Sequence, residues 1–330
     1  MQPVTNAVLL LALLVSGCTP SASPSPGSTG IYDGDYPIRA VATVGMVADI
    51  VREVGGERVA VQQLLGAGVD PHLFKPTRDD VAQIGGADIV FYSGLMLEGK
   101  MADTLIKVGR GKPVFAVTEE IDEAMLLEPE DLEGHYDPHV WMDVAAWGDC
   151  VDVVATALSE FDPPHAEEYR TRADRYSAQL LALDAYGKQS LATVPRDSRV
   201  LITSHDAFGY FGRAYGLEVM GVQGLSTESE TGLQRINELV DLVVDRQVKA
   251  VFVESSVPRK NIQALVDGAM SRGYQVTIGG ELFSDAMGEA GAYEGTYIGM
   301  LDHNITRVTN ALGGQAPAAG LNGKLSPQHE

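Results

Sequence analysis

Residues 163–195 read PPHAEEYRTRADRYSAQLLALDAYGKQSLATVP, and this stretch decides how the chain is organised. No proline interrupts it between His165 and Thr193, and apolar side chains recur every three or four residues, at Tyr169, Ala173, Tyr176, Leu180, Leu183 and Tyr186. That spacing predicts one long amphipathic helix, bounded by Pro163-Pro164 and by Pro195. A helix of about 29 residues would be about 43 Å long. It could therefore run along two lobes and limit their hinge motion.

On both sides of this stretch, short β-rich runs alternate with helical patterns. The expected strands are residues 38–44, 59–65, 89–92, 113–117, 200–203, 250–253 and 274–278, and a turn is expected at Gly279-Gly280 after the last of them. The expected helices are residues 46–54, 77–86, 208–215, 233–246, 261–272 and 297–312. Apolar strands that alternate with helices are typical of parallel sheets covered on both faces. We therefore predict an α/β fold of two lobes, each a mainly parallel sheet flanked by helices: an N-terminal lobe over 36–162, a linking helix over 163–195, and a C-terminal lobe over 196–330 with a short disordered tail.

The start of the chain resembles a bacterial lipoprotein signal peptide. Residues 7–15 form an apolar run that suits a signal-peptide core and is too short to span a bilayer. The run leads through Ser16-Gly17 into Cys18, although no Lys or Arg precedes it. We expect a signal peptide over residues 1–17 and lipid on Cys18, with cleavage without lipidation as the alternative. Residues 18–35 are rich in Pro, Ser and Gly and are expected to form a flexible tether that holds an extracytoplasmic body at the cell membrane.

Charge and cysteine content narrow the possible functions. The formal net charge of −21 argues against nucleic acid as a partner. With lipid on Cys18, Cys150 has no cysteine left to pair with, and we expect it to be a buried structural thiol.

Four widely separated segments carry the residues that bind metals. They are GVDPH ending at His72, DPHVWMD around His139, TSHD around His205 and LFSD ending at Asp285. Each segment lies just beyond an expected strand or in a loop beside one, and ligands of open α/β sheets bind at the carboxyl ends of strands. Three imidazoles and one carboxylate suit a borderline divalent transition metal. The sequence therefore predicts a single metal site that the fold assembles in a cleft between the lobes.

Other polar residues near these segments have alternative interpretations. Glu254 ends an expected strand and competes with Asp285 for the fourth ligand position, and His135 could be an auxiliary ligand. Neighbouring aspartates are expected to support backbone or ligand rings, at Asp137, Asp143 and Asp206. Trp141 and Phe208 are expected to shield the site from water. The remaining histidines are interpreted as structural or solvated, at His165, His303 and His329.

An enzyme and a surface adhesin are the rival classes of protein. Ser204-His205-Asp206 contains the residue types of a hydrolase triad, but three adjacent residues cannot form the required relay. A catalytic zinc normally keeps one coordination position for water, whereas four protein ligands would fill the site. We therefore expect a carrier of metal and not an enzyme, with a metal-dependent hydrolase or an adhesin as the alternative.

These segments, in this order, resemble those of the metal-receptor lipoproteins of ABC importers for zinc, manganese or iron. FVESSV over 252–257, EGTYIGM over 294–300 and His303-Asn304 add to the resemblance, which extends from about Ile38 to Leu312. It implies two α/β lobes joined by a long helix, metal ligands at His72, His139, His205 and Asp285, and delivery to an ABC permease and its ATPase subunit. A monomer is expected.

This sequence differs from the usual pattern of the family at two places, and both differences bear on which metal is bound. Many manganese receptors have a glutamate where this chain has His205, and many zinc receptors have a long histidine-rich loop where residues 119–136 are acidic and contain only His135. Three nitrogens and one carboxylate should hold Zn²⁺ more tightly than Mn²⁺. We therefore expect Zn²⁺ or Mn²⁺ as the transported ion, with Fe²⁺ less favoured.

Overall fold

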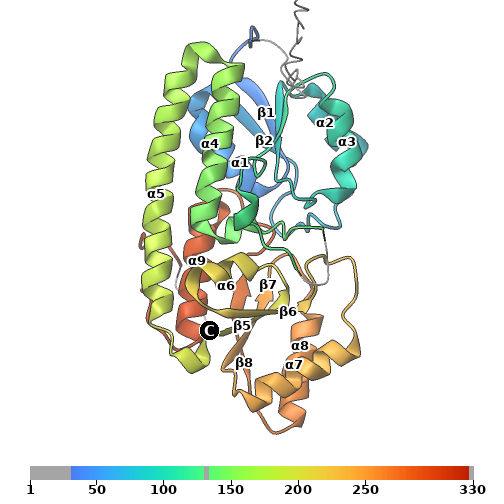
Figure 1. The fold of residues 1–330 in the computed structure, drawn as a ribbon, viewed down its shortest axis with the longest axis vertical. Coiled ribbons are helices and arrows are strands. Elements are labelled where there is room, and N and C mark those ends of the chain that lie inside the picture. Colours follow the sequence, from blue (N-terminus) through green and yellow to red (C-terminus); the bar gives the residue numbers. More distant parts are fainter. Residues whose placement is uncertain (1–30, 130–133, 327–330) are drawn as a thin grey trace, which may run out of the picture.

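The structure, a computed structural model, describes residues 31–129 and 134–326. They form two α/β lobes, one above the other in Figure 1, with a long helix along one side of both. The expected signal peptide, the lipidation site Cys18, most of the tether and the last four residues lie outside the described residues. Within the described ranges, no helix combines the length and the apolar character that crossing a membrane requires.

The N-terminal lobe is built on a four-stranded parallel sheet. Its strands are β1 (Ile38–Ala42), β2 (Val59–Gln63), β3 (Ile89–Tyr92) and β4 (Val114–Ala116), in the order β2-β1-β3-β4. Helices α2 (Arg78–Gly86) and α3 (Ala102–Val108) lie on one side of the sheet, and α1 (Gly45–Gly55) and α4 (Val144–Phe161) lie on the other (Figure 1). Thr77 caps α2 in a reciprocal pair of hydrogen bonds with Asp80, as its place before the helical pattern predicts.

The C-terminal lobe contains two pairs of parallel strands. β5 (Val200–His205) pairs with β6 (Glu218–Gln223), and β7 (Ala250–Glu254) pairs with β8 (Thr277–Leu282). The helices of this lobe are α6 (Gly209–Tyr215), α7 (Leu233–Asp245), α8 (Lys260–Ser271) and α9 (Tyr297–Ala311). The mainly parallel α/β architecture predicted for both lobes is confirmed.

The long helix α5 (Ala166–Ala192) has 27 residues and packs against both lobes. The Tyr176 hydroxyl donates to Asp49 of α1 at 2.7 Å, and the Tyr186 hydroxyl lies 2.7 Å from the Thr306 hydroxyl of α9. The larger of the two apolar cores runs through both lobes and includes the inward face of α5. The predicted linking helix is therefore confirmed, and buried hydrogen bonds hold it against both lobes.

The structure corrects several expected elements. β8 starts at Thr277 and continues through Gly279-Gly280, which the sequence suggested as a turn, and its pairing with β7 shifts register between Val251 and Phe252. A side chain at Gly279 would collide with the Phe252 ring, which explains glycine within this strand. β6, α3 and the full length of α4 were not predicted. Much of α4 is buried, so its sequence lacks the polar stripe that marks a surface helix.

Candidate metal centre

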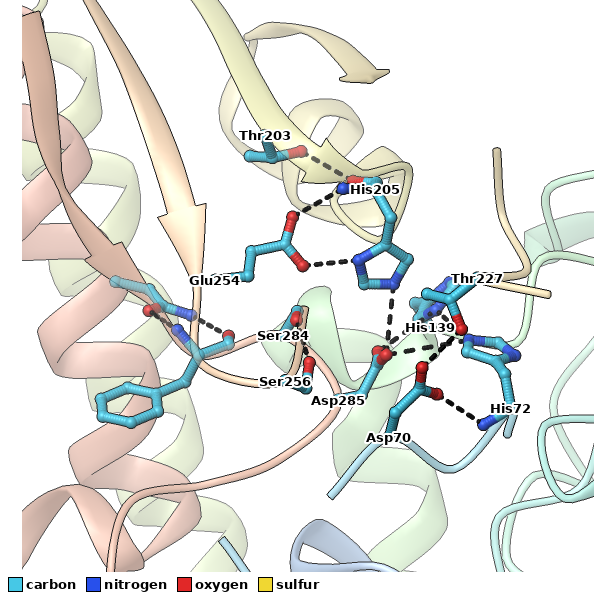
Figure 2. Close-up of polar contacts among 12 residues, drawn as sticks. Asp70, His72, His139, Thr203, His205, Thr227, Glu254, Ser256, Ser284 and Asp285 are labelled. Carbon is cyan, nitrogen blue, oxygen red and sulfur yellow. Dashed lines mark hydrogen bonds and ion pairs between the residues drawn. The ribbon is translucent and has the colours of Figure 1, made fainter. Parts of the chain in front are cut away.

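The fold brings together the four residues singled out in the sequence (Figure 2). His72 lies on the loop after β2, and His139 precedes a short 3₁₀ turn (Val140–Met142) that leads into α4. His205 is the last residue of β5, and Asp285 lies in the loop after β8. Each residue offers one ligand atom, and these four atoms all lie within 4.8 Å of one another. Two potential ligands thus come from each lobe.

The side chains of this group converge on one point. His72 Nε2 is 3.2 Å from His139 Nε2, His139 Nε2 is 3.4 Å from Asp285 Oδ1, and His205 Nε2 is 3.2 Å from Asp285 Oδ2. His139 and His205 are fully buried, Asp285 is 1% exposed and His72 is 9% exposed. Both Asp285 oxygens and His205 Nε2 are buried without a hydrogen-bond partner in the described part of the chain. Buried polar atoms are normally satisfied, so this geometry favours a cation at the point of convergence.

A carboxylate orients each of the two fully buried imidazoles. Asp137 Oδ1 accepts from the His139 amide at 2.9 Å and lies 2.7 Å from His139 Nδ1. Glu254 Oε1 accepts from the His205 amide at 2.8 Å, and Oε2 lies 2.5 Å from His205 Nδ1. In both residues Nε2 is left to face the centre, an orientation that carboxylates behind metal-binding histidines commonly impose. Glu254 therefore faces the outer nitrogen of His205 and does not join the group of four.

The loop that carries Asp285 is held by its neighbours. The Asn304 side chain of α9 accepts from the Phe283 amide at 3.0 Å and donates to the Phe283 carbonyl at 2.7 Å. The buried Trp141 indole donates to the Ser284 carbonyl at 2.9 Å, and its ring centroid is 5.2 Å from that of His139. The sequence did not indicate the role of Asn304. Asn304 lies on α9 and contacts the loop that carries Asp285, and the spacing of residues along the sequence does not reveal such a contact.

Burial and nearby carboxylates shift the pKa values of the two fully buried histidines, His139 and His205. Burial lowers the pKa of His139, but Asp137 and Asp285 outweigh it and raise that pKa to about 9. Burial likewise lowers the pKa of His205, and Asp285 together with Glu254 raises it well above its usual value. Without a metal, these raised pKa values favour protonated rings whose Nε2–H groups face the Asp285 oxygens. A metal ion that binds at this point takes the place of those protons.

The other two members of the group behave differently. Burial lowers the pKa of His72 to about 4, and the charge of Asp285 offsets only part of this effect. Burial raises the pKa of Asp285, but His205 and His139 outweigh it and hold that pKa well below its usual range. His72 is thus ready as a neutral ligand, and Asp285 as an anion.

The remaining residues singled out in the sequence lie outside this group. His135 is exposed, His165 pairs with Asp162 at 2.9 Å and His303 bonds to the Glu281 carbonyl at 2.9 Å. Asp143 caps α4, whereas Asp206 supports no ligand ring through a hydrogen bond in the described ranges. Phe208 and Cys150 are fully buried. His329 lies outside the described residues.

The hydrolase-like segment has no catalytic geometry. Ser204 and His205 are successive residues of β5, so their side chains point to opposite faces of the strand. The Ser204 hydroxyl is buried and makes no hydrogen bond with any described residue. Ser204 therefore cannot act as a nucleophile activated by His205.

Sequence comparison identifies the family. The family model described as the periplasmic component A of a zinc-uptake complex (ZnuA) matches residues 40–311. The chain belongs to this family. The resemblance seen in the motifs is thereby confirmed, over the part of the chain that carries both lobes and all four candidate ligands.

Individual relatives cover most of the chain. The manganese-binding lipoprotein MntA of Bacillus subtilis is 46% identical over 312 residues, which are 94% of this chain and 99% of the relative. The zinc-binding protein TroA of Treponema pallidum is 46% identical over 272 residues, or 82% of this chain and 88% of the relative. A solved structure of the periplasmic zinc-binding TroA superposes with a TM-score of 0.81 at 45% identity and covers 83% of this chain and 99% of that one.

Proposed function

We propose that this protein captures one divalent transition-metal ion between its lobes, with His72, His139, His205 and Asp285 as ligands, and delivers it to an ABC permease. The spacing of the candidate ligand atoms carries the proposal. A tetrahedral ion with bonds of about 2.0–2.1 Å holds its ligand atoms about 3.3–3.4 Å apart. Three separations in this group, 3.2, 3.2 and 3.4 Å, match that spacing. His72 Nε2 is 3.8 Å from Asp285 Oδ2, and the four ligand atoms lie within 4.8 Å of one another, so a tetrahedral ion fits once the group contracts around it.

The donor set suits Zn²⁺ or Mn²⁺. Three nitrogens and one oxygen favour Zn²⁺ on the general stability order of divalent metals. Asp285 turns Oδ1 toward His139 and Oδ2 toward His205, so it can bind through one oxygen or through both. Binding through one oxygen gives the four-coordinate site that Zn²⁺ prefers. Binding through both adds a second oxygen, as a fifth contact to the ion, and oxygen ligands suit the harder Mn²⁺. Relatives named for manganese support Mn²⁺ as the cargo.

The family belongs to ABC import systems, in which a permease and an ATPase subunit are the partners. Several relatives are named lipoproteins, which implies an extracytoplasmic, membrane-anchored location. For this chain we propose a signal peptide over residues 1–17, a lipid anchor on Cys18 and a tether over 18–35. The proposed division of the body is 36–162, 163–195 and 196–330, and the proposed state is a monomer.

Transport rather than catalysis is the activity of the family. Its members are metal-binding components of uptake systems, so the expectation that the chain is not an enzyme is confirmed. The relatives described above are named for metal binding and not for hydrolysis or adhesion. The filled set of four protein side chains agrees with carriage, because a catalytic zinc keeps one position for water.

Calorimetric titration with Zn²⁺ and Mn²⁺, after metal analysis of protein purified without added metal, tests the proposal. The unmodified protein should bind one ion, and His139→Ala or His205→Ala should abolish tight binding while the metal-free fold persists. His135→Ala is the matched control, because this exposed imidazole is four residues from His139 and outside the group. Near-normal affinity in either ligand variant would remove that residue from the coordination shell.

A further inference from the structure

The two Asp-Pro-His segments of the site use their aspartates differently. Asp70 and Asp137 each accept a hydrogen bond from the backbone amide of the histidine two residues later, at 2.8 and 2.9 Å. Asp137 also holds the His139 ring. Asp70 instead accepts from the Thr227 hydroxyl at 2.5 Å (Figure 2). Thr227 lies between β6 and α7, so this hydrogen bond joins the His72 loop to the opposite lobe.

His72 is the least anchored of the four candidate ligands. It is the most exposed of them, and no carboxylate in the described ranges pairs with its Nδ1. The loop that carries it has no regular secondary structure from Leu64 to Pro76, and Gly68 adopts a φ of +69°. The position of the His72 ring therefore depends on its backbone, and that backbone is tied to Asp70.

A second contact between the lobes lies next to the first. Glu228 Oε1 is 2.5 Å from Lys100 Nζ, which belongs to the N-terminal lobe. The Glu228 side chain is 52% exposed, and exposed ion pairs contribute little because water and salt screen them. Thr227 and Asp70 are each only partly exposed, so their hydrogen bond is better shielded. Of these two contacts between the lobes, the hydrogen bond from Thr227 to Asp70 is therefore expected to contribute more to holding the His72 loop.

We propose that Thr227 is a positioning residue that clasps the His72 loop from the opposite lobe and sets the rate at which the metal leaves. This inference rests on the proposed function, because delivery requires at least one ligand to withdraw. His72 can withdraw most easily, since its ring lacks the carboxylate that holds His139 and His205. While the Thr227 hydroxyl holds Asp70, the His72 backbone cannot swing outward. Loss of the clasp should therefore accelerate release without removing a ligand.

The test measures release of Zn²⁺ from the full chain into an excess of a chromogenic chelator by stopped flow. Thr227→Val keeps nearly the same shape and removes the hydroxyl. Its release rate should rise about tenfold, the effect of one lost hydrogen bond to a charged group. Binding should remain one ion per chain, and the melting temperature of the metal-free protein should fall by only about 2–4 °C, because one hydrogen bond is lost there as well. Thr227→Ser, which keeps the hydroxyl, should restore the original rate.

Ser226→Ala is the matched control. Among the described residues, the Ser226 hydroxyl accepts one hydrogen bond, from the Glu228 amide of its own segment, so its loss should leave the release rate unchanged. Release from Thr227→Val at the original rate would overturn the clasp while leaving the proposed function intact, since one Zn²⁺ would still bind. Equal acceleration by Ser226→Ala would also overturn it, because any disturbance of the segment would then suffice. Failure of the unmodified protein to bind Zn²⁺ would overturn the proposed function itself.

Discussion

Glu254 holds His205 with both of its oxygens: Oε1 accepts from the backbone amide and Oε2 faces the ring Nδ1. Asp137 makes the equivalent two contacts to His139 with the single oxygen Oδ1. The two carboxylates therefore differ in how well an amide could replace them. A glutamine has one accepting oxygen, so its NH₂ group would face an N–H donor of His205.

Glu254→Gln should therefore weaken metal binding about 10–100-fold, the usual cost of losing a support of a metal-binding histidine. Asp137→Asn should cost less, because one amide oxygen can still accept from both the amide and the ring of His139. Calorimetric competition titrations of the two variants, side by side, measure the difference. Equal losses would show that the charge of these carboxylates matters and that the number of accepting oxygens does not.

Asp49 should make the stability of the metal-free protein depend on pH. Burial raises the pKa of Asp49 to about 6 from its ordinary value of 3.8, even though the Tyr176 hydroxyl and the Tyr297 amide donate to it. The fold thus favours the protonated acid. Its stabilising effect is complete below the unfolded pKa and is lost as the pH rises through about 6, a difference of about 3 kcal/mol.

Asp49→Asn cannot ionise at this position. Its free energy of unfolding should rise relative to that of the unmodified protein by up to about 3 kcal/mol between about pH 4 and pH 7. Urea titrations of the metal-free proteins at several pH values measure this trend. Asp174→Asn, at an exposed position of α5, should show no comparable trend. A difference between Asp49→Asn and the unmodified protein that stays constant with pH would contradict the prediction.

At Gly187 of α5, the side chain of Tyr215 from α6 packs against the helix. A Cβ atom there would lie 2.8 Å from Cε1 and 2.9 Å from Cζ of the buried Tyr215 ring. Gly187→Ala should therefore destabilise the protein, because overpacking costs about 1–3 kcal/mol and alanine regains only about 1 kcal/mol of helix propensity. Gly148 of α4 has open space around it, so Gly148→Ala should instead stabilise by up to about 1 kcal/mol. Denaturant unfolding of both variants measures whether each substitution lowers or raises the free energy of unfolding. Stabilisation by Gly187→Ala would refute the packing argument.

The lobes should move little when metal binds. Helix α5 is tied to α1 through Tyr176 and to α9 through Tyr186, and one apolar core continues through both lobes. Small-angle scattering should give nearly the same radius of gyration for the metal-free and Zn²⁺-bound protein, with His139→Ala as the variant that cannot respond to Zn²⁺. A large compaction on binding would show that α5 does not restrain the lobes.

The sequence by itself determined the features that depend on local chemistry. The three- and four-residue spacing of apolar side chains placed α5, and Thr77 before a helical pattern placed the start of α2. The motifs around the three histidines and Asp285 singled out residues that the fold brings together, because each lies at or just beyond the end of a strand or in a loop at that edge. These signals lie within a few residues of each element, and distant contacts do not alter them.

Tertiary structure decided the features that depend on packing between distant segments. Glu254 and Asp285 were both candidates for the fourth position, and only the pairing of Glu254 with His205 Nδ1 separates their roles. Gly279 lies inside β8, where the Phe252 ring fills the space that a side chain would need. The contact between Thr227 and Asp70 crosses from one lobe to the other. None of these could be read from the sequence alone, because each depends on how close two segments lie after folding, and residue spacing along the chain does not encode that distance.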